Sequence, residues 1–247
     1  MDILICGDAH AKPKVSQRRF DWLGHYIKDT KPHTVVQMGD WFDMESLSSY
    51  DKGKKSFEGR RYKADIAAGQ EAFDRVRIAL GSTRRPRLIS LLGNHENRIE
   101  RAVENNAELD GLLSSNDCKD DWWETCPFLE TIQVCGINFQ HYFTTGVMGR
   151  PQAGEYPAAN LIKKQFVSCV QGHTHVLDSA MRTTATGQRI RGVVAGCYMD
   201  PLQKETYAGP ANAVWWKGLV RLKNVEAGTF DLEEISIGRL QEAYGKR

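Results

Sequence analysis

The chain has 247 residues, of which 41% are hydrophobic and 26% are charged, as in an ordinary globular protein. The formal net charge of +2 is too small to indicate nucleic-acid binding, and six scattered cysteines without a C-x-x-C pair argue against a disulfide framework or a structural zinc site. Neither a membrane-spanning run nor a signal peptide is recognisable, so we expect a cytoplasmic protein that does not bind membranes.

Strands alternate with helices in the first half of the chain. Short apolar runs predict strands over residues 3–6, 34–38 and 88–92, and apolar periodicity predicts helices over residues 16–29, 64–80 and 96–109. Ser16 is the expected N-cap of the first helix. A polar segment over residues 46–61 separates the second strand from the second helix.

The later part of the chain is expected to consist mainly of strands. These are predicted over residues 128–134, 137–143, 166–170, 190–195, 215–222 and 229–237. Helix-linked strands followed by hairpin-like strands predict an α/β fold in which two mixed β-sheets pack as a sandwich flanked by helices. We expect one domain over residues 1–247 without a separate capping domain, and we expect the strands after residue 175 to complete the second sheet.

Potential metal ligands follow five of the predicted strands. The segments are "ILICGDAH", "VVQMGD", "LISLLGNHE", "NFQH" and "FVSCVQGHTH", and they hold five of the seven histidines. Because sites in α/β proteins collect at the carboxyl ends of strands, these side chains are expected to meet at one edge. Carboxylates, imidazoles and one amide without thiolates favour manganese, iron, nickel or zinc in a catalytic site. Asp40 is a candidate to bridge two ions.

The ordered set of Asp-x-His, Gly-Asp, Gly-Asn-His-Glu, a lone His and Gly-His-x-His resembles the calcineurin-like metallophosphoesterases. It covers residues 8 to 175. The resemblance implies a two-sheet sandwich and a centre of two divalent ions, with Mn²⁺ favoured and iron, zinc and nickel as alternatives. The protein serine/threonine phosphatases are a less suitable subgroup, because "GDWFDME" lacks their Arg-Gly after the second Asp.

The resemblance also implies a role for each matching position. Asp40 would bridge the ions, His95 would stand beside the leaving group, and Asp43 would orient His95. The metal ligands would be Asp8, His10 and His175 for one ion, and Asn94, His141 and His173 for the other. Simpler interpretations stay open for four positions: a turn residue for Asn94, a core side chain for His141, a helix cap for Asp43 and a first-turn carboxylate for Glu96.

A phosphodiesterase that acts on nucleic acid or nucleotides is the leading functional hypothesis. In the two-metal mechanism a metal-bridging hydroxide attacks phosphorus, and His95 donates a proton to the leaving oxygen or stabilises its charge. A phosphomonoesterase, acting on nucleotides, small molecules or phosphoproteins, is the alternative. A binding protein with a degraded site is less favoured, because the ligand set is intact. The oligomeric state stays open, with a homodimer as one option.

The polar segment supplies candidate substrate contacts. We assign them to Lys54, Lys55, Arg60 and Arg61, which alternate with aromatic residues and would grip a phosphate backbone; a solvated loop is the alternative. Arg98 and Arg101 add positive charge, or form ion pairs on one helix face. The tryptophan pairs of "DDWWETCP" and "AVWWKG" are interpreted as core or dimer interface rather than as base-stacking side chains. The stretch over residues 198–216 is left without a role beyond a site rim.

Overall fold

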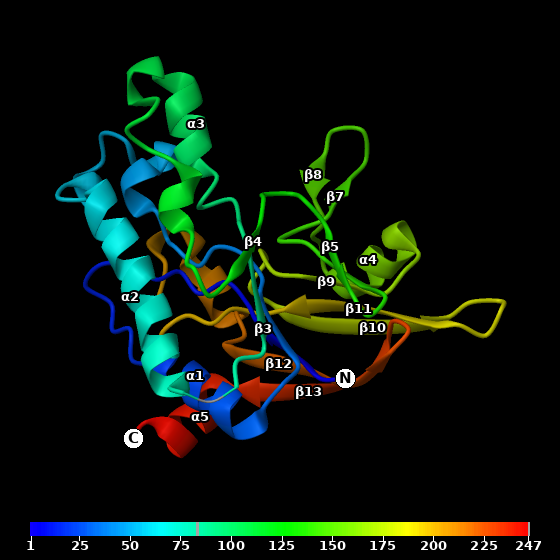
Figure 1. Ribbon diagram of the computed structural model, residues 1–247. Coiled ribbons are helices and arrows are strands. Elements are labelled where there is room, and N and C mark those ends of the chain that lie inside the picture. The colour runs from blue at the N-terminus through cyan, green and yellow to red at the C-terminus, as the bar shows by residue number, and fades with distance from the viewer. Residues whose placement is uncertain (83, 247) are drawn as a thin grey trace.

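The computed structural model describes residues 1–82 and 84–246, and its first sheet is built around the N-terminal strand (Figure 1). Six strands lie in the order β13-β12-β1-β2-β3-β4. Strands β1, β2, β3 and β4 run parallel, whereas β12 lies antiparallel to both β1 and β13. Their bounds are Ile3–Cys6 for β1, Thr34–Gln37 for β2, Arg87–Leu91 for β3, Glu124–Cys126 for β4, Gly218–Glu226 for β12 and Thr229–Ser236 for β13.

The second sheet has five strands in the order β10-β11-β9-β6-β5. Its central strands β11, β9 and β6 are parallel, and each edge strand is antiparallel to its neighbour. Their bounds are Ile132–Val134 for β5, Ile137–Phe139 for β6, Cys169–Gln171 for β9, Leu177–Thr183 for β10 and Arg189–Ala195 for β11. A separate two-stranded ribbon pairs β7 (Thr144–Thr145) with β8 (Arg150–Pro151).

Helices cover the outer faces of the two sheets (Figure 1). α1 (Arg19–Thr30), α2 (Tyr62–Leu80) and α5 (Ile237–Tyr244) share a buried apolar cluster with the first sheet, and α4 (Pro157–Gln165) packs on the second. α3 (Arg98–Asn105) follows the third strand. No helix in the described residues is long and apolar enough to cross a membrane.

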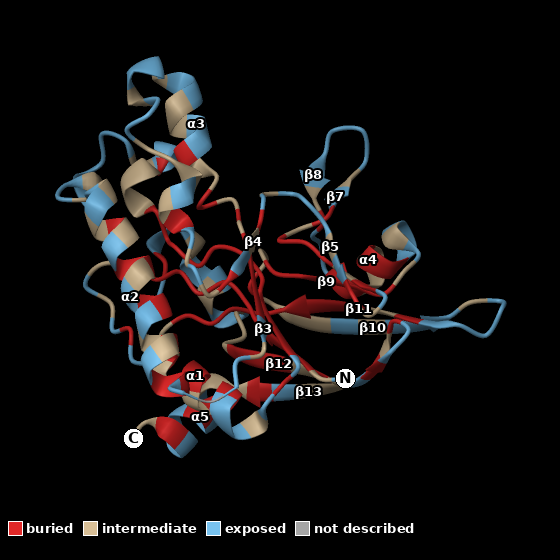
Figure 2. Ribbon diagram, in the orientation of Figure 1, coloured by how far each residue is buried: buried red, intermediate tan, exposed pale blue. Residues whose placement is uncertain are grey.

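The core lies between the sheets and beneath the helices, where the central strands β1, β2 and β9 are entirely buried, whereas β10 and β13 at the sheet edges are partly exposed (Figure 2). Strand β1 is buried on both faces, as expected for a strand in a parallel sheet. Ile3 and Ile5 point into the sandwich, whereas Leu4 and Cys6 face the helices. This run of four apolar residues therefore places the residues after it at the edge of a rigid layer.

The structure confirms the expected fold class of two mixed sheets with flanking helices. The expectation that the strands after residue 175 would complete the second sheet is wrong for β12 and β13. These strands belong to the first sheet, because β12 pairs with β1 and places Val220 opposite Ile5. Only β10 and β11 join the second sheet.

Helix boundaries differ from the expected ones at several places. α1 begins at Arg19, and Ser16 is not its N-cap, because its hydroxyl only accepts a 3.4 Å bond from the Arg18 N–H. The expected helix 96–109 is divided into α3 and a short 3₁₀ helix, η4 (Ala107–Leu109). The last strand ends at Ser236, whose side chain caps the unexpected helix α5.

The remaining 3₁₀ helices lie in the loops. Two short turns, η1 (Glu45–Leu47) and η2 (Ser49–Asp51), follow β2, and η3 (Lys55–Phe57) precedes α2. η5 (Ser115–Cys118) precedes β4, and η6 (Thr206–Ala213) lies between β11 and β12.

Candidate metal centre

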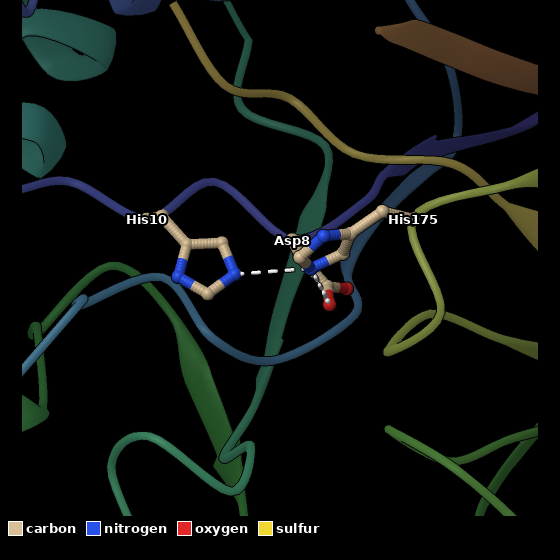
Figure 3. Close-up of side chains that lie close together, drawn as sticks. All are labelled: Asp8, His10 and His175. Atoms are coloured by element: carbon tan, nitrogen blue, oxygen red, sulfur yellow. Dashed lines mark hydrogen bonds and ion pairs between the residues drawn. The ribbon is translucent and has the colours of Figure 1, made fainter. Parts of the chain in front are cut away.

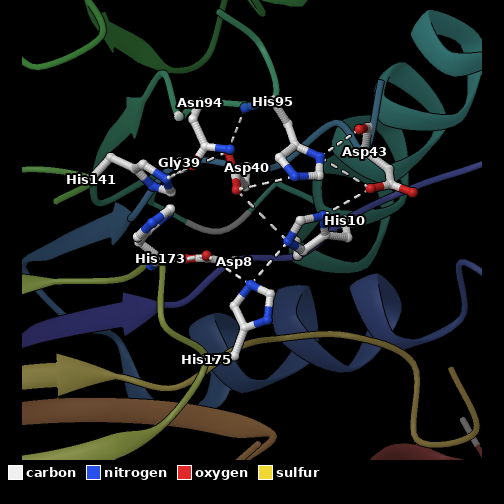
Figure 4. A network of polar contacts seen from close by, with 12 residues as sticks. Asp8, His10, Gly39, Asp40, Asp43, Asn94, His95, His141, His173 and His175 are labelled. Atoms are coloured by element: carbon white, nitrogen blue, oxygen red, sulfur yellow. Dashed lines mark hydrogen bonds and ion pairs between the residues drawn. The ribbon is translucent and has the colours of Figure 1, made fainter. Parts of the chain in front are cut away.

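Five strands, three from the first sheet and two from the second, deliver the candidate ligands to one site (Figure 4). In each case the strand ends one to three residues before its first polar side chain. The side chains that follow are Asp8 and His10 after β1, Asp40 and Asp43 after β2, Asn94 and His95 after β3, His141 after β6, and His173 and His175 after β9. The predicted meeting of these segments is therefore present in the structure.

One group consists of Asp8, His10 and His175 (Figure 3). One ligand atom from each of the three lies within 4.8 Å of the others. The Nε2 atoms of His10 and His175 are 3.1 Å apart, and His175 Nε2 lies 3.1 Å from Asp8 Oδ2. Such a convergence of buried nitrogen and oxygen donors fits one divalent transition-metal ion.

A second group combines Asp40, His141 and His173, whose ligand atoms also lie within 4.8 Å of one another. His141 Nε2 is 2.9 Å from Asn94 Oδ1 and 3.5 Å from Asp40 Oδ1. The amide oxygen of Asn94 thus points at the same space as the imidazole. This donor set fits a second divalent ion.

Asp40 lies between the two groups. Its Oδ1 faces His141, and its Oδ2 lies 3.8 Å from His10 Nε2 in the first group. The backbone N–H of His95 donates to Asp40 Oδ1 over 2.8 Å and fixes the orientation of the carboxylate. The two carboxylate oxygens of Asp40 therefore face one group each.

Hydrogen bonds at Nδ1, the ring nitrogen that faces away from the centre, set the tautomers of His10 and His141. His10 Nδ1 is 3.0 Å from Asp43 Oδ1, and His141 Nδ1 is 2.8 Å from the carbonyl oxygen of Met38. Because both partners only accept hydrogen bonds, each Nδ1 carries a proton and each Nε2 presents its lone pair to the centre. Histidines that bind metals in proteins are held in this way.

The ligand loops adopt strained backbone conformations. His10, Asp40, His173 and His175 all have a positive φ, between 44° and 69°. This left-handed region is uncommon for residues other than glycine, and such outliers cluster at functional sites.

Two glycines permit the close packing of these loops. A Cβ added at Gly93 would lie 2.1 Å from Asp40 Oδ1, and one at Gly172 would lie 2.2 Å from Asp8 Oδ1. Neither carboxylate has room to withdraw, because Asp8 and Asp40 are both buried. The glycine that precedes each of these ligand motifs is therefore a packing requirement.

The buried histidines stabilise the ionised form of the buried carboxylates. Burial opposes the ionisation of Asp40, but the imidazoles of His141, His95 and His10 outweigh it and hold the pKa of this carboxyl below its usual value. The pKa of Asp43 is likewise lowered, because hydrogen bonds from His10 and His95 outweigh burial. Both carboxylates therefore stay ionised, and the centre offers anionic oxygen to a cation.

His95 and Asp43 contact each other, which places His95 beside the carboxylate that was expected to orient it. His95 Nδ1 is 2.5 Å from the Asp43 carbonyl oxygen and 3.1 Å from Asp43 Oδ1. Asp43 does not cap the helix near Met44, because η1 has no side-chain cap. Burial and the charge of Arg98 lower the pKa of His95, but Asp40 and Asp43 outweigh both and raise it overall.

Arg98 is a contact of the centre that sequence reasoning missed. Its Nη2 lies 3.0 Å from His95 Nε2, and its Nη1 donates to the carbonyl oxygens of Asp43 (3.0 Å) and Met44 (3.2 Å). A guanidinium group only donates, so His95 Nε2 accepts this bond. The alternative of ion pairs on one helix face is wrong, since neither Arg98 nor Arg101 pairs with a carboxylate within the described residues.

Glu96 connects the loops that carry the candidate ligands. This role of Glu96 was also missed by sequence reasoning. Its buried carboxylate accepts backbone N–H bonds from Asp40 (3.0 Å), Phe42 (2.8 Å) and Gly93 (2.8 Å). Glu96 precedes α3 and therefore is not the first-turn helix carboxylate of the simpler interpretation. Its only sequence signal is its place after Asn94 and His95.

Lys12 is a third missed neighbour of the centre. Its ammonium lies 3.3 Å from Asp43 Oδ2 and 2.6 Å from Glu205 Oε1. Glu205 belongs to the stretch 198–216, which is thereby fastened to the centre. On the same side, the ring of Trp215 packs edge-on against His175 at 4.3 Å between centroids.

The four candidate substrate residues do not contact the metal centre. Lys54 and Arg60 pair with Asp51 at 3.1 and 2.8 Å, and Arg61 donates to a neighbouring carbonyl oxygen. Lys55 is exposed in η3. All four residues lie in the loop before α2. Their contact with a substrate remains a prediction.

Comparisons with known proteins agree with the fold and the motifs. Residues 1–178 match the family model of the calcineurin-like phosphoesterases. No curated protein matches the chain.

Two solved structures are similar over most of the chain. A predicted phosphoesterase from Streptococcus pneumoniae TIGR4 is 11% identical, with 96% of this chain and 90% of that chain covered and a TM-score of 0.40. Yfce, a phosphoesterase from E. coli, is 13% identical, with 96% and 100% covered and a TM-score of 0.42. At these low TM-scores, neither likeness carries an argument about activity.

Proposed function

The chain belongs to the calcineurin-like phosphoesterase family, and we propose that it is a two-metal phosphodiesterase for nucleic acid or nucleotide substrates. The observation that supports this proposal is the pair of donor groups between which Asp40 lies. The proposed ligands are Asp8, His10 and His175 for one ion, Asn94, His141 and His173 for the other, and Asp40 for both. When bound, such ions polarise the phosphoryl oxygens and lower the pKa of water.

His95 is the proposed proton donor to the leaving group. Hydrolysis forms a bond between phosphorus and a water oxygen and breaks the bond to the leaving oxygen, which then takes up a proton. Asp40 and Asp43 raise the pKa of His95 against burial and the charge of Arg98, and so favour the protonated imidazole. Asp43 orients the ring through Nδ1 and leaves Nε2 for the leaving oxygen, in place of its present contact with Arg98.

Mn²⁺ is the ion that we favour, with iron, zinc and nickel as alternatives. The donors are imidazole nitrogens, carboxylate oxygens and one amide oxygen, and the groups contain no thiolate. Such a set suits these first-row metals, and availability decides among them. Elemental analysis of protein purified without added metal identifies the resident ion.

An exposed aromatic side chain, next to a half-buried one at the centre, supports a nucleic-acid or nucleotide substrate. The Tyr207 side chain is 67% exposed, and its ring lies 6.3 Å from that of Trp215, which packs on His175. Rings exposed beside a phosphate-cleaving centre offer stacking surfaces for bases.

The test compares three substrate classes with the manganese-loaded protein. We expect turnover of bis-p-nitrophenyl phosphate and of labelled single- or double-stranded DNA, and little turnover of p-nitrophenyl phosphate. Asp40→Asn should abolish the activity and reduce the bound metal, whereas Arg182→Gln on the distant part of β10 should change neither. Activity on the monoester alone would make the protein a phosphomonoesterase, and inactivity with every metal would favour a binding protein.

A further inference from the structure

A small pocket lies between α3 and the loop that follows β2. Its volume is about 150 Å³. Leu47 and Tyr50 line it from the loop, and Ala102, Asn105 and Leu109 line it from the side of α3 and η4. We call this cavity the α3 pocket.

The α3 pocket carries positive charge that no carboxylate among its described lining residues balances. Lys52, Arg98 and Arg101 line it, and none of its described lining residues is an Asp or Glu. None of the three cations has an ion pair among the residues that the structure describes. Lys54 and Arg60 in the same loop differ, since both pair with Asp51. The α3 pocket is therefore suited to an anion.

Arg98 connects the α3 pocket to the metal centre. The side chain lines the pocket, and its Nη2 touches Nε2 of His95. Two carbonyl oxygens hold its Nη1, so the guanidinium has a defined position. The pocket thus adjoins the side of the centre from which the leaving group would depart.

We propose that the α3 pocket binds a second phosphate, carried by the leaving group of the substrate. This inference rests on the proposed phosphoesterase function. Arg101 and Lys52 would contact this phosphate, and the side chain of Tyr50, which is 79% exposed, offers a face to an adjoining base. The leaving group is then either the next nucleotide of an oligonucleotide or a nucleoside phosphate released from a pyrophosphate.

The test uses Arg101→Gln in the full-length manganese-loaded protein. Arg182→Gln is the matched control, because it removes the same charge from an exposed position on β10, toward the far end of the hairpin with β11. The substrates are bis-p-nitrophenyl phosphate, the dinucleotide TpT, the same dinucleotide with a phosphate at each end (pTpTp), and dithymidine diphosphate (TppT). Only the last two carry a second phosphate.

Arg101→Gln is expected to lower kcat/KM about tenfold for substrates with a second phosphate, as expected for one lost charge-assisted hydrogen bond. The other two substrates should change less than twofold, and Arg182→Gln should change none. A loss confined to pTpTp identifies an oligonucleotide, and a loss confined to TppT identifies a pyrophosphate. Equal effects on all four substrates, or equal effects of both variants, would overturn the inference while the proposed function stands.

If no phosphoester is turned over, the proposed function itself is refuted. A binding measurement then still tests the α3 pocket. Fluorescein-labelled pentathymidylate is then titrated into the same manganese-treated protein at several salt concentrations. The α3 pocket predicts that Arg101→Gln reduces the slope of log K against log salt by about 0.7, the value for one phosphate contact on a single strand. An unchanged slope would overturn the inference.

Discussion

Replacement of Glu96 tests how the ligand loops are held together. Its carboxylate accepts three buried backbone N–H bonds, from Asp40 and Gly93 at Oε2 and from Phe42 at Oε1. In Glu96→Ala all three donors lose their partner. Each unsatisfied buried group costs about 1–3 kcal/mol, so the variant should lose roughly 3–9 kcal/mol of unfolding free energy. That loss is a large part of the about 5–15 kcal/mol typical of a folded domain.

Glu96→Gln gives a graded comparison. Its amide oxygen can replace Oε2 and keep the bonds from Asp40 and Gly93, but the amide nitrogen then opposes the Phe42 N–H. We expect this variant to lose about 1–3 kcal/mol, and to bind metal some 10–100-fold more weakly, as is typical for a lost support of metal ligands.

Urea unfolding followed by tryptophan fluorescence measures these losses, and elemental analysis measures the bound metal. Glu100→Ala is the control, because Glu100 is exposed in the first turn of α3. It should change stability by less than about 0.5 kcal/mol. The role assigned to Glu96 is refuted if Glu96→Ala is no less stable than Glu100→Ala.

Three further predictions concern single positions of the centre. His95→Ala should keep its full metal content and lose about 10²–10⁴-fold in kcat on bis-p-nitrophenyl phosphate; an unchanged rate would remove this residue from the mechanism. Gly172→Ala should lose metal, because the new Cβ would lie 2.2 Å from Asp8 Oδ1, whereas Gly238→Ala, whose Cβ has no neighbour closer than 4.0 Å, should retain it. Burial and then His141 lower the pKa of His173 to about 4, so the metal-free protein should lose stability as the pH falls from 6.5 to 4, by at most about 1.4 kcal/mol per pH unit. His173→Gln should flatten that part of the urea-midpoint profile; an unchanged profile would contradict the assignment.

The meeting of the ligand motifs could be predicted because each motif follows a short apolar strand. Parallel strands that end at the same edge of one sheet bring Asp8, Asp40 and Asn94 together whatever the loops between them do. His141 was harder to predict, since a lone histidine in a strand has no local signature. Its hydrogen bond to the Met38 carbonyl oxygen, 103 positions away in the sequence, depends on the packing of the two sheets.

Other features could not be predicted because they depend on contacts between distant segments. Lys12 lies between Asp43 and Glu205, which are separated by a large part of the chain. The sequence indicates only that Arg98 adds positive charge or pairs on a helix face, because periodicity shows which residues share a face but not which carbonyl oxygens lie next to it. The pairing of β12 with β1 likewise has no signal in either strand, since both are simply apolar.

That pairing leads us to propose that residues 1–247 fold as one domain. The family match ends at residue 178, yet β1 lies between β2 and β12. The backbone of Asp8 also accepts a bond from the Tyr198 N–H, so the first ligand loop rests on the later segment. We expect the fragment over residues 1–178 to be insoluble or unfolded, with one side of β1 exposed.

The position of β1 also has a consequence during protein synthesis. Val220 is made 215 positions after its partner Ile5. At about 5–20 residues per second, the strand waits roughly 10–40 s for its neighbour. In that interval its open edge is available to other chains or to a chaperone, so the yield of folded protein should depend on translation speed.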